Sequence, residues 1–206
     1  MSKAIFLGSF NPPHKGHYNC IKSVIKSDVM NRLNIDKIHI IPCRQNPNKG
    51  KYGTTYLDRY AMCNYMFHDY IEDNKVIIDE IENKFYFVYT YDLLKFIHTG
   101  QYPAINKDFW WIITYETYNE LIEQEWYRSI QLRIENKFIV IVKNNDEIKR
   151  IKEEEKNNDN IRFVKLIGNF NMHSTELRER SKYEDISEYT NEDVNQYIKT
   201  NELYLK

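Results

Sequence analysis

The sequence predicts an α/β fold in which a doubly wound parallel sheet carries helices on both faces. Short apolar runs without strict alternation of polar and apolar residues indicate strands that are buried on both sides. Amphipathic segments between those runs indicate helices that cover the sheet. At 206 residues, the chain can bury one substantial core but is too short for two ordinary domains. We therefore expect residues 1–206 to form a single domain.

The first strand and the first helix have the clearest signals. Ala4–Leu7 is apolar and is followed at once by Gly8 and by prolines that break regular structure, which predicts a buried strand. Apolar residues then recur at helical spacing over Gly16–Met30, which predicts a helix. Lys37–Pro42 is apolar again and predicts a second strand, which its own proline ends. This order of elements is typical of a parallel sheet.

The alternation of helices and strands continues along the chain. Further helices are expected at Leu57–Tyr70 and at Tyr89–His98, the latter closed by Gly100, and further strands at Val76–Ile78, Phe109–Ile113, Phe138–Val142 and Arg162–Leu166. Two segments lack an apolar pattern: Gln45–Thr55 is interpreted as a mobile loop, and Asn144–Asn160 as a solvated helix and loop. Together these elements predict a Rossmann-like domain.

Composition excludes several classes of protein. The longest apolar runs fall short of the roughly 18 residues that a bilayer span requires, so no membrane partner is expected. Cys20, Cys43 and Cys63 are odd in number and form no C-x-x-C pair, which argues against a disulfide framework or a thiolate zinc site and favours a reducing, cytoplasmic setting. With 29 basic and 30 acidic residues, the chain has no general attraction for nucleic acid. An anionic ligand must therefore be held by local groups.

The loop after the first strand is a candidate phosphate site. In doubly wound sheets the loop after the first strand leads into a helix whose free N–H groups attract phosphate. Gly8 would let the backbone approach a phosphate closely, and Ser9 and Phe10 would offer main-chain N–H donors. Neither a G-x-G-x-x-G fingerprint nor a P-loop sequence is present. Their absence argues against a nicotinamide-dependent dehydrogenase and a P-loop kinase.

Two histidines follow in the same loop. His14 and His17 are three residues apart at a helix start, so both imidazoles can lie on one face and converge on one phosphate, and Gly16 leaves that approach open. An isolated His-x-x-His pattern is more often incidental or metal-binding than catalytic. Its position after a buried first strand and a Gly-Ser-Phe turn favours a catalytic interpretation.

A second candidate segment lies near the end of the chain. His173–Arg178 reads as a helix start, with Ser174 as the N-cap and an acidic residue in the first turn. A plain capped helix is the simpler interpretation of this segment by itself. Ser174 and Thr175 nevertheless place hydroxyls and backbone donors at a positive helix end, and Arg178 adds a cationic fork one turn later. Such a set would suit a triphosphate.

These two segments, in this order, resemble the nucleotidyltransferases that carry an HxGH motif. Within that superfamily the sequence is most similar to the bacterial-type nicotinate or nicotinamide mononucleotide adenylyltransferases. The similarity extends over most of the chain and includes the segments Gly8–His17, Pro42–Lys49, Tyr89–Asp92, Ile112–Glu116 with Trp126, and the chain end with Leu203 and Tyr204. Three positions depart from the family pattern: Asn48 replaces a frequent histidine, His173 replaces a serine, and residues 114–116 replace Gly-x-Asp.

The resemblance implies attack by the 5′-phosphate of a pyridine mononucleotide on the α-phosphorus of ATP, with Mg²⁺ held through the ATP phosphates. It implies the following roles: His14, His17, Lys49 and Arg178 stabilise phosphate charge; Thr90 and Trp126 contact the pyridine ring; Tyr115 and Glu116 contact the adenosine; Arg44 and Lys143 are further candidates for the mononucleotide phosphate. No dedicated protein ligand for a metal is expected.

Three alternatives stay open. Another HxGH-type transferase would use a pantetheine phosphate or a sugar or choline phosphate. A nucleotide-binding regulator without catalysis is also compatible, because Asn48 and Glu116 depart from the family pattern. The sequence leaves the choice between nicotinate and nicotinamide mononucleotide open, although similarity to the bacterial type favours the acid. It also leaves open whether the chain forms a homo-oligomer.

Overall fold

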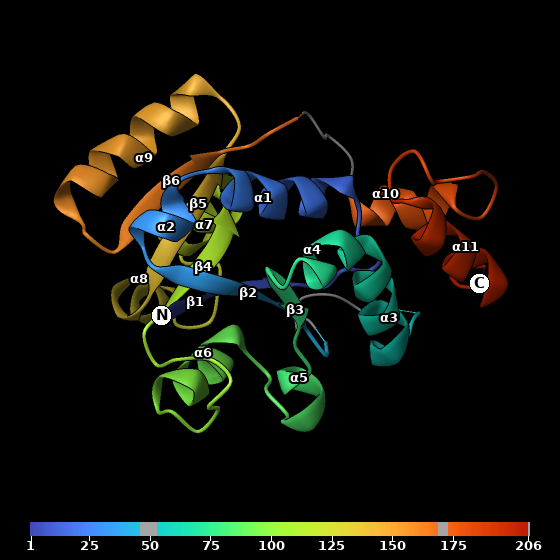
Figure 1. Ribbon diagram of the computed structural model, residues 1–206, viewed down its shortest axis with the longest axis horizontal. Helices are drawn as coiled ribbons and strands as arrows, with labels where there is room; N and C mark the ends of the chain where they lie inside the picture. The colour runs from blue at the N-terminus through green and yellow to red at the C-terminus, as the bar shows by residue number, and fades with distance from the viewer. Residues whose placement is uncertain (46–52, 169–172, 206) are drawn as a thin grey trace.

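A six-stranded parallel sheet forms the centre of the molecule (Figure 1). The computed structural model describes residues 1–45, 53–168 and 173–205. The strands lie in the order β3-β2-β1-β4-β5-β6, and each neighbouring pair is parallel. Their bounds are β1 Ser2–Gly8, β2 Ile35–Pro42, β3 Val76–Ile78, β4 Phe109–Thr114, β5 Lys137–Val142 and β6 Ile161–Lys165. This order confirms the predicted doubly wound, Rossmann-like sheet.

Helices cover both faces of the sheet. Their bounds are α1 Lys15–Lys26, α2 Val29–Arg32, α3 Tyr56–Met66, α4 His68–Glu72, α5 Ile81–Lys84, α6 Thr90–His98, α7 Tyr115–Ile122, α8 Ser129–Glu135, α9 Asn145–Asn157, α10 Ser174–Arg180 and α11 Glu192–Thr200. One hydrophobic core lies under α1 to α4, α10 and α11. A second core lies under α5 to α9, on the opposite face. On β1, alternate residues serve the two cores, Phe6 the first and Ile5 the second.

Two of the predicted helices are interrupted. The helix expected over Gly16–Met30 is split into α1 and α2 at Ser27, whose hydroxyl donates to the carbonyl of Val24 at 2.8 Å and so competes with the helical backbone bonds. The helix expected over Leu57–Tyr70 is split into α3 and α4 at Phe67, which is fully buried and leaves helical geometry with φ −110°. The break thus coincides with a side chain that is buried in the core.

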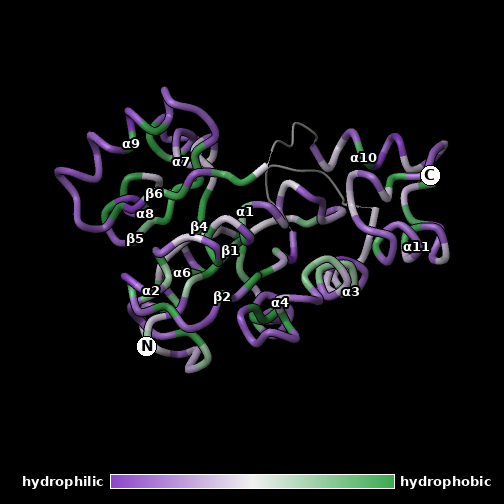
Figure 2. The backbone as a smooth tube through the Cα atoms, turned by 45° about the horizontal axis from the view of Figure 1, so that its top comes forward, coloured by the Kyte–Doolittle hydropathy of each residue, from purple (hydrophilic) through white to green (hydrophobic). Residues whose placement is uncertain are grey.

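The polar segment Asn144–Asn160 forms a surface helix, as expected. Helix α9 covers most of that segment and buries only Ile151. Figure 2 shows the tube of α9 as largely hydrophilic and that of β4 as hydrophobic. Among the described residues, no helix combines the length and the apolar character that crossing a bilayer requires.

The sheet order reverses next to β1, because β2 pairs with one side of β1 and β4 with the other. Crossover connections leave opposite faces at such a switch point, and the carboxyl ends of the two neighbouring strands then border a crevice where ligands of doubly wound folds bind. The turns after β1 and β2 and the start of α7 after β4 all lie at this edge. They contain the histidine pair, Arg44, Tyr115 and Glu116, whereas Thr90, Trp126 and the candidates of α10 come from other parts of the chain.

Candidate active site

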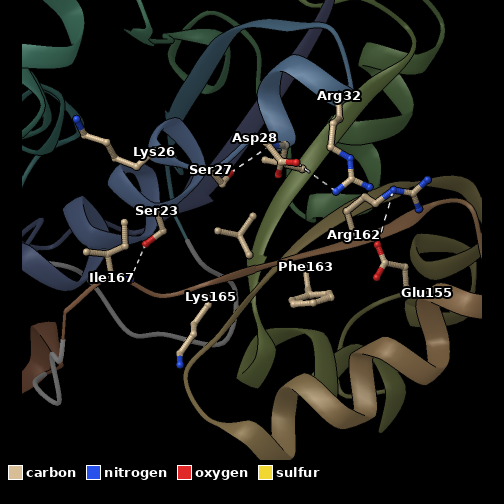
Figure 3. A pocket seen from close by; sticks show the side chains of 12 residues that line it. Ser23, Lys26, Ser27, Asp28, Arg32, Glu155, Arg162, Phe163, Lys165 and Ile167 are labelled. Carbon is tan, nitrogen blue, oxygen red and sulfur yellow. Dashed lines mark hydrogen bonds and ion pairs between the residues drawn. The ribbon is translucent and has the colours of Figure 1, made fainter.

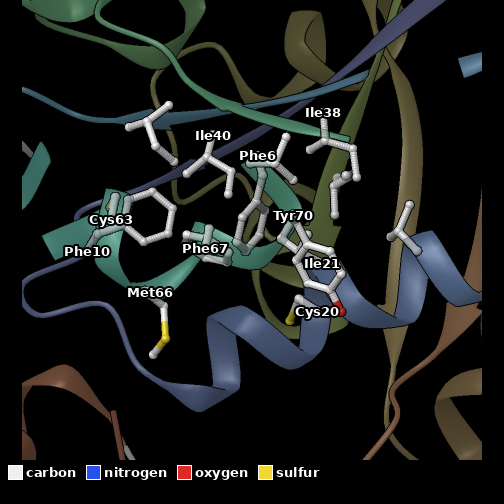
Figure 4. Close-up of a cluster of buried hydrophobic side chains, with 14 of the residues drawn as sticks. Phe6, Phe10, Cys20, Ile21, Ile38, Ile40, Cys63, Met66, Phe67 and Tyr70 are labelled. Carbon is white, nitrogen blue, oxygen red and sulfur yellow. The ribbon is translucent and has the colours of Figure 1, made fainter. Parts of the chain in front are cut away.

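The turn after β1 is built around a buried aromatic ring. Phe10 has a positive φ of 47° and is 1% exposed. Its ring packs edge-on against Phe6, with centroids 5.7 Å apart (Figure 4). It also packs edge-on against His17, with centroids 4.9 Å apart. A Cβ atom at Gly8 would lie 2.9 Å from Cζ of Phe10. Gly8 is therefore needed to make room for this ring, a reason that differs from the close phosphate approach expected from the sequence.

The two histidines that follow cap helix α1. His14 is the N-cap residue, and its Nδ1 accepts from the backbone N–H of Gly16 at 3.1 Å. In the reciprocal bond, Nδ1 of His17 accepts from the backbone N–H of His14 at 3.2 Å. The ring centroids are 3.7 Å apart. Because both Nδ1 atoms act as acceptors, each neutral ring carries its proton on Nε2 and can donate it to a phosphate oxygen.

Electrostatics favours the neutral form of the first histidine. Burial lowers the pKa of His14 far below its ordinary value, and the neighbouring charges of His17 and His173 lower it further. His14 is therefore uncharged at neutral pH and acts as a hydrogen-bond donor rather than as a cation. Because the charge of His173 affects the pKa of His14, the residue that precedes α10 lies near the turn after β1.

The two segments that the sequence singled out do meet. Oγ of Ser174 donates to the carbonyl of Pro12 at 3.0 Å. Nη1 of Arg178 donates to the carbonyl of Asn11 at 2.8 Å, and its Nη2 donates to Oγ1 of Thr175 at 3.1 Å. Residues 162 and 167 positions apart are thus hydrogen-bonded. The expected contact between the two segments is confirmed, whereas a shared triphosphate stays a prediction.

The prediction of Ser174 as N-cap is wrong by one residue. Helix α10 begins at Ser174 itself, and His173 is its N-cap, with extended backbone angles and no side-chain capping bond. The Ser174 hydroxyl is engaged with Pro12 instead of with the backbone of its own helix. Tertiary contact with the first turn therefore replaces local capping.

Asn11 connects the first turn to distant parts of the chain. It is 2% exposed, and its Oδ1 accepts from Oγ1 of Thr54 at 2.8 Å and from the hydroxyl of Tyr204 at 2.7 Å. Burial raises the pKa of Tyr204, so this phenol stays protonated and remains a donor. The sequence alone did not identify Asn11 and Tyr204 as site residues, although the chain end was noted as family-like.

Arg59 joins the turn after β1 to the turn after β2. Its guanidinium is buried, with the residue 1% exposed. Nη1 donates to the carbonyls of Ser9 at 2.9 Å and Cys43 at 2.6 Å, and Nη2 donates to the carbonyl of Arg44 at 2.9 Å. Charge-assisted bonds to three carbonyls fix both turns relative to each other. The sequence placed Arg59 in the helix after the loop without giving it this function.

The candidates for pyridine contact belong to elements that pack into the second core, on the opposite face of the sheet from α10. Thr90 is the first residue of α6, after the N-cap Tyr89. The ring of Tyr89 stacks on that of Tyr127, with centroids 4.3 Å apart. Nε1 of the half-buried Trp126 donates to a carboxylate oxygen of Glu120 at 2.8 Å. The structure thus brings the chain neighbours of Thr90 and Trp126 into direct contact.

The remaining candidates are less closely connected to the first turn. Tyr115 and Glu116 form the first turn of α7 after β4, and the hydroxyl of Tyr115 accepts from Arg150 of α9 at 3.3 Å. Arg44 and Lys143 are exposed and follow the ends of β2 and β5, respectively. Lys49 lies outside the described residues, so its predicted function is not addressed by the structure.

A surface hollow of about 430 Å³ lies elsewhere, between α1, α2, α9 and β6 (Figure 3). Four of its charged side chains form two ion pairs: Arg162 lies 3.8 Å from Glu155, and Arg32 lies 3.6 Å from Asp28. None of the sequence-predicted site residues lines this hollow. The crevice at the ends of β1, β2 and β4 therefore stays the candidate active site.

Comparison with known proteins gives a family match over most of the chain. The Cytidylyltransferase-like family model matches residues 5–180. The probable nicotinate-nucleotide adenylyltransferase of Fusobacterium nucleatum is 33% identical over 96% of this chain and 97% of its own length, and that of Clostridium tetani is 31% identical over 98% of each.

A solved structure extends the comparison to the fold. The nicotinic acid mononucleotide adenylyltransferase of Plasmodium falciparum, complexed with NaAD, superposes with a TM-score of 0.75 over 98% of this chain and 97% of its own, at 22% identity. At that identity the superposition establishes a shared fold. Because the family model matches most of the chain and the curated relatives match nearly all of it, the chain belongs to the Cytidylyltransferase-like family.

Proposed function

We propose that the protein transfers the adenylyl group of ATP to nicotinate mononucleotide, giving the dinucleotide and pyrophosphate in NAD biosynthesis. One observation carries the proposal: α10 contacts the turn that holds the paired histidines. Ser174 donates a hydrogen bond to the carbonyl of Pro12, and Arg178 donates one to the carbonyl of Asn11. Similarity to curated nicotinate-nucleotide adenylyltransferases over nearly the whole chain supports the choice of substrates. Nicotinamide mononucleotide is a further candidate acceptor.

In this proposal the two substrates bind on opposite faces of the sheet. Helix α10 packs into the core under α1 and α3 through Leu177, so the triphosphate of ATP belongs to that side. Tyr91 of α6 and Trp126 pack into the opposite core, so the pyridine ring belongs there. The turn from Gly8 to His14 lies between the two sides. An α-phosphate placed at this turn can be reached by a mononucleotide from the opposite side.

The chemistry needs positioning and charge stabilisation more than base catalysis. The phosphate of the mononucleotide has a second pKa of about 6, so it is largely dianionic at neutral pH. One of its oxygens forms the new bond to the α-phosphorus as the bond from the α-phosphorus to the bridging oxygen of pyrophosphate breaks. Nε2–H donors on His14 and His17 stabilise the charge that builds on the α-phosphoryl oxygens.

Cationic groups and the metal neutralise the remaining phosphate charge. Arg178 is held by Asn11 and Thr175 at the start of α10, so its fork is oriented before ATP binds. Lys49 has the same function in this proposal. Mg²⁺ enters as part of the MgATP substrate, coordinated by phosphate oxygens and water.

A substrate panel tests the proposal. Purified protein is incubated with MgATP and, in turn, nicotinate mononucleotide, nicotinamide mononucleotide and phosphopantetheine, and with MgCTP and choline phosphate, while pyrophosphate release and the nucleotide product are measured. The proposal predicts turnover with nicotinate mononucleotide and the corresponding dinucleotide product. Turnover with only phosphopantetheine or choline phosphate would identify a different transferase. ATP binding without pyrophosphate release for any acceptor would identify a non-catalytic nucleotide-binding protein.

A further inference from the structure

Glu82 is a buried carboxylate that the proposed mechanism does not use. It lies on the short helix α5 and is 7% exposed. Its Oε2 accepts from the backbone N–H of Arg44 at 2.7 Å. Acidic side chains are rarely buried unless they are paired, because removing a charge from water is costly. A buried carboxylate that binds the backbone of a site loop therefore requires an explanation.

The backbone after β2 is held from two sides. Glu82 accepts from the N–H of Arg44, while Arg59 donates to the carbonyls of Cys43 and Arg44. Arg59 also donates to the carbonyl of Ser9, in the turn after β1. The carboxylate and the guanidinium thus act together on the loop backbone that borders the crevice. We call Glu82 and Arg59 the loop clamp.

Helix α5 is itself firmly anchored, so Glu82 is held in place. The Oδ1 atom of Asp79 accepts from the backbone N–H of Ile81 at 2.9 Å and from the hydroxyl of Tyr102 at 2.7 Å. Its Oδ2 lies 2.7 Å from Nδ1 of the buried His39 on β2. These contacts connect the start of α5 to the neighbouring strand and limit its movement relative to β2.

Within the loop clamp, Glu82 belongs to α5 on the side of the site that the proposed function gives to the mononucleotide, whereas Arg59 belongs to α3 on the opposite side. Ile81 of α5 packs in the same core as Ile41 of β2 and Tyr91 of α6. The guanidinium of Arg44 lies over the ring of Tyr86, 5.6 Å from its centroid, on the same side. Arg44 is also one of the sequence-predicted candidates for the mononucleotide phosphate. Its backbone position consequently depends on Glu82.

We propose that Glu82 is a positioning residue for the mononucleotide: with Arg59 it fixes the backbone of Arg44 so that this residue is preorganised to receive the acceptor phosphate. The substrate named here rests on the proposed function, whereas the clamp itself rests on the contacts. Preorganisation of a binding loop lowers the entropy cost of binding. Loss of the clamp should therefore weaken mononucleotide binding more than ATP binding.

Ionisation of Glu82 supplies a specific signature. Burial raises the pKa of Glu82 to about 7, against the lowering effects of the Arg44 N–H and the Arg59 charge. Burial and the nearby carboxylates Glu80, Glu82 and Asp79 in turn raise the pKa of Tyr56 on α3, so these titratable groups face one another. The charged form is the stronger acceptor, so the clamp should tighten as pH rises through neutrality.

Glu82→Gln tests the proposal, because the amide keeps an acceptor oxygen and removes the charge. Glu154→Gln is the matched control. The carboxylate of Glu154 also accepts a hydrogen bond, here from the hydroxyl of Tyr118 at 2.6 Å, and it lies in a different part of the molecule. KM for nicotinate mononucleotide, KM for ATP and kcat are measured from pH 6 to pH 8.5. The acceptor phosphate titrates in this range as well, so variant-to-wild-type ratios are compared at each pH.

At pH 8 the KM of Glu82→Gln for the mononucleotide should be about tenfold higher than that of the wild type, the effect of weakening one hydrogen bond to a charged group. The ratio should approach one at pH 6, while kcat and the KM for ATP change less than about twofold. Glu154→Gln should match the wild type throughout. A ratio that does not vary with pH, or equal losses for both substrates, would overturn the proposal.

A second measurement separates failure of the clamp from failure of the proposed function. The amide resonance of Arg44 is followed by NMR in the absence of substrates. It should titrate with a midpoint near the pKa of Glu82 in the wild type, and this transition should disappear in Glu82→Gln. Titration without any turnover would reject the function and retain the clamp. Turnover with an Arg44 amide that does not titrate would reject the clamp.

Discussion

Glu82 should also reduce the stability of the fold at neutral pH, and replacing it with Gln should restore that stability. Its pKa rises from the ordinary 4.5 to about 7 on folding, so between these values the folded protein binds more protons than the unfolded chain. Stability must then fall as pH rises through this window. At about 1.4 kcal/mol per pKa unit, the wild type should lose about 2 to 3 kcal/mol relative to Glu82→Gln between pH 5 and pH 8.

Urea denaturation of both proteins at pH 5, 6, 7 and 8 measures this effect. The relevant quantity is the difference in the free energy of unfolding between variant and wild type, because the other titrating groups are common to both. A constant cost of fitting the amide beside Arg59 would shift all four differences equally and leave their trend unchanged. A difference that stays flat, or that falls with pH, would refute the assignment of a raised pKa to this carboxylate.

Three further substitutions test the first turn. His17→Ala should lower kcat by about two orders of magnitude or more, since it removes a donor that stabilises transition-state charge; an unchanged kcat would remove His17 from the mechanism. Arg178→Lys keeps the charge but loses the guanidinium that bonds to Asn11 and Thr175. Steady-state kinetics should therefore show kcat/KM for ATP reduced by about tenfold to a hundredfold. Wild-type kinetics in this variant would contradict the function given to Arg178. Tyr204→Phe removes the hydroxyl that donates to Asn11 and should lower the free energy of unfolding in urea by about 1 to 2 kcal/mol; no change would mean that this bond contributes nothing to the turn.

Much of the fold could be predicted because buried parallel strands leave a simple signal. Each predicted strand overlaps an observed one, and Val76–Ile78 and Phe138–Val142 differ from β3 and β5 by at most one residue. Helix breaks were harder to predict. The interruption at Phe67 coincides with a ring that is buried against Phe10 and Tyr18, and local propensity carries no trace of such contacts.

The candidate site was predictable where chemistry and local structure coincide. His14 and His17 share a helix start, and Ser174 and Arg178 share another, so residue type and spacing identified both segments. Sequence could not supply the connections between them. Tyr204 bonds to Asn11 across 193 positions, and such contacts have no local periodicity.

Arg59 and Glu82 were missed for a related physical reason. Both act on backbone groups, Arg59 on carbonyls and Glu82 on an N–H group. Any residue type presents the same backbone groups, so the partner positions carry no compositional signature. The only local clue was the charge itself, and a charged residue in a helix is usually solvated. The sequence does not reveal that these two charged side chains are buried, and it is their burial that distinguishes them from ordinary surface charges.

The central claim is that the paired histidines and the start of α10 hold one triphosphate between them. A crystal structure of the protein with a non-hydrolysable ATP analogue and Mg²⁺ tests it most directly. We predict phosphate oxygens within hydrogen-bonding distance of Nε2 of His14 or His17 and, in the same ligand, of the backbone or side chains of Ser174, Thr175 or Arg178. A triphosphate bound away from the turn between Gly8 and His17, or contacted by only one of the two segments, would contradict the account.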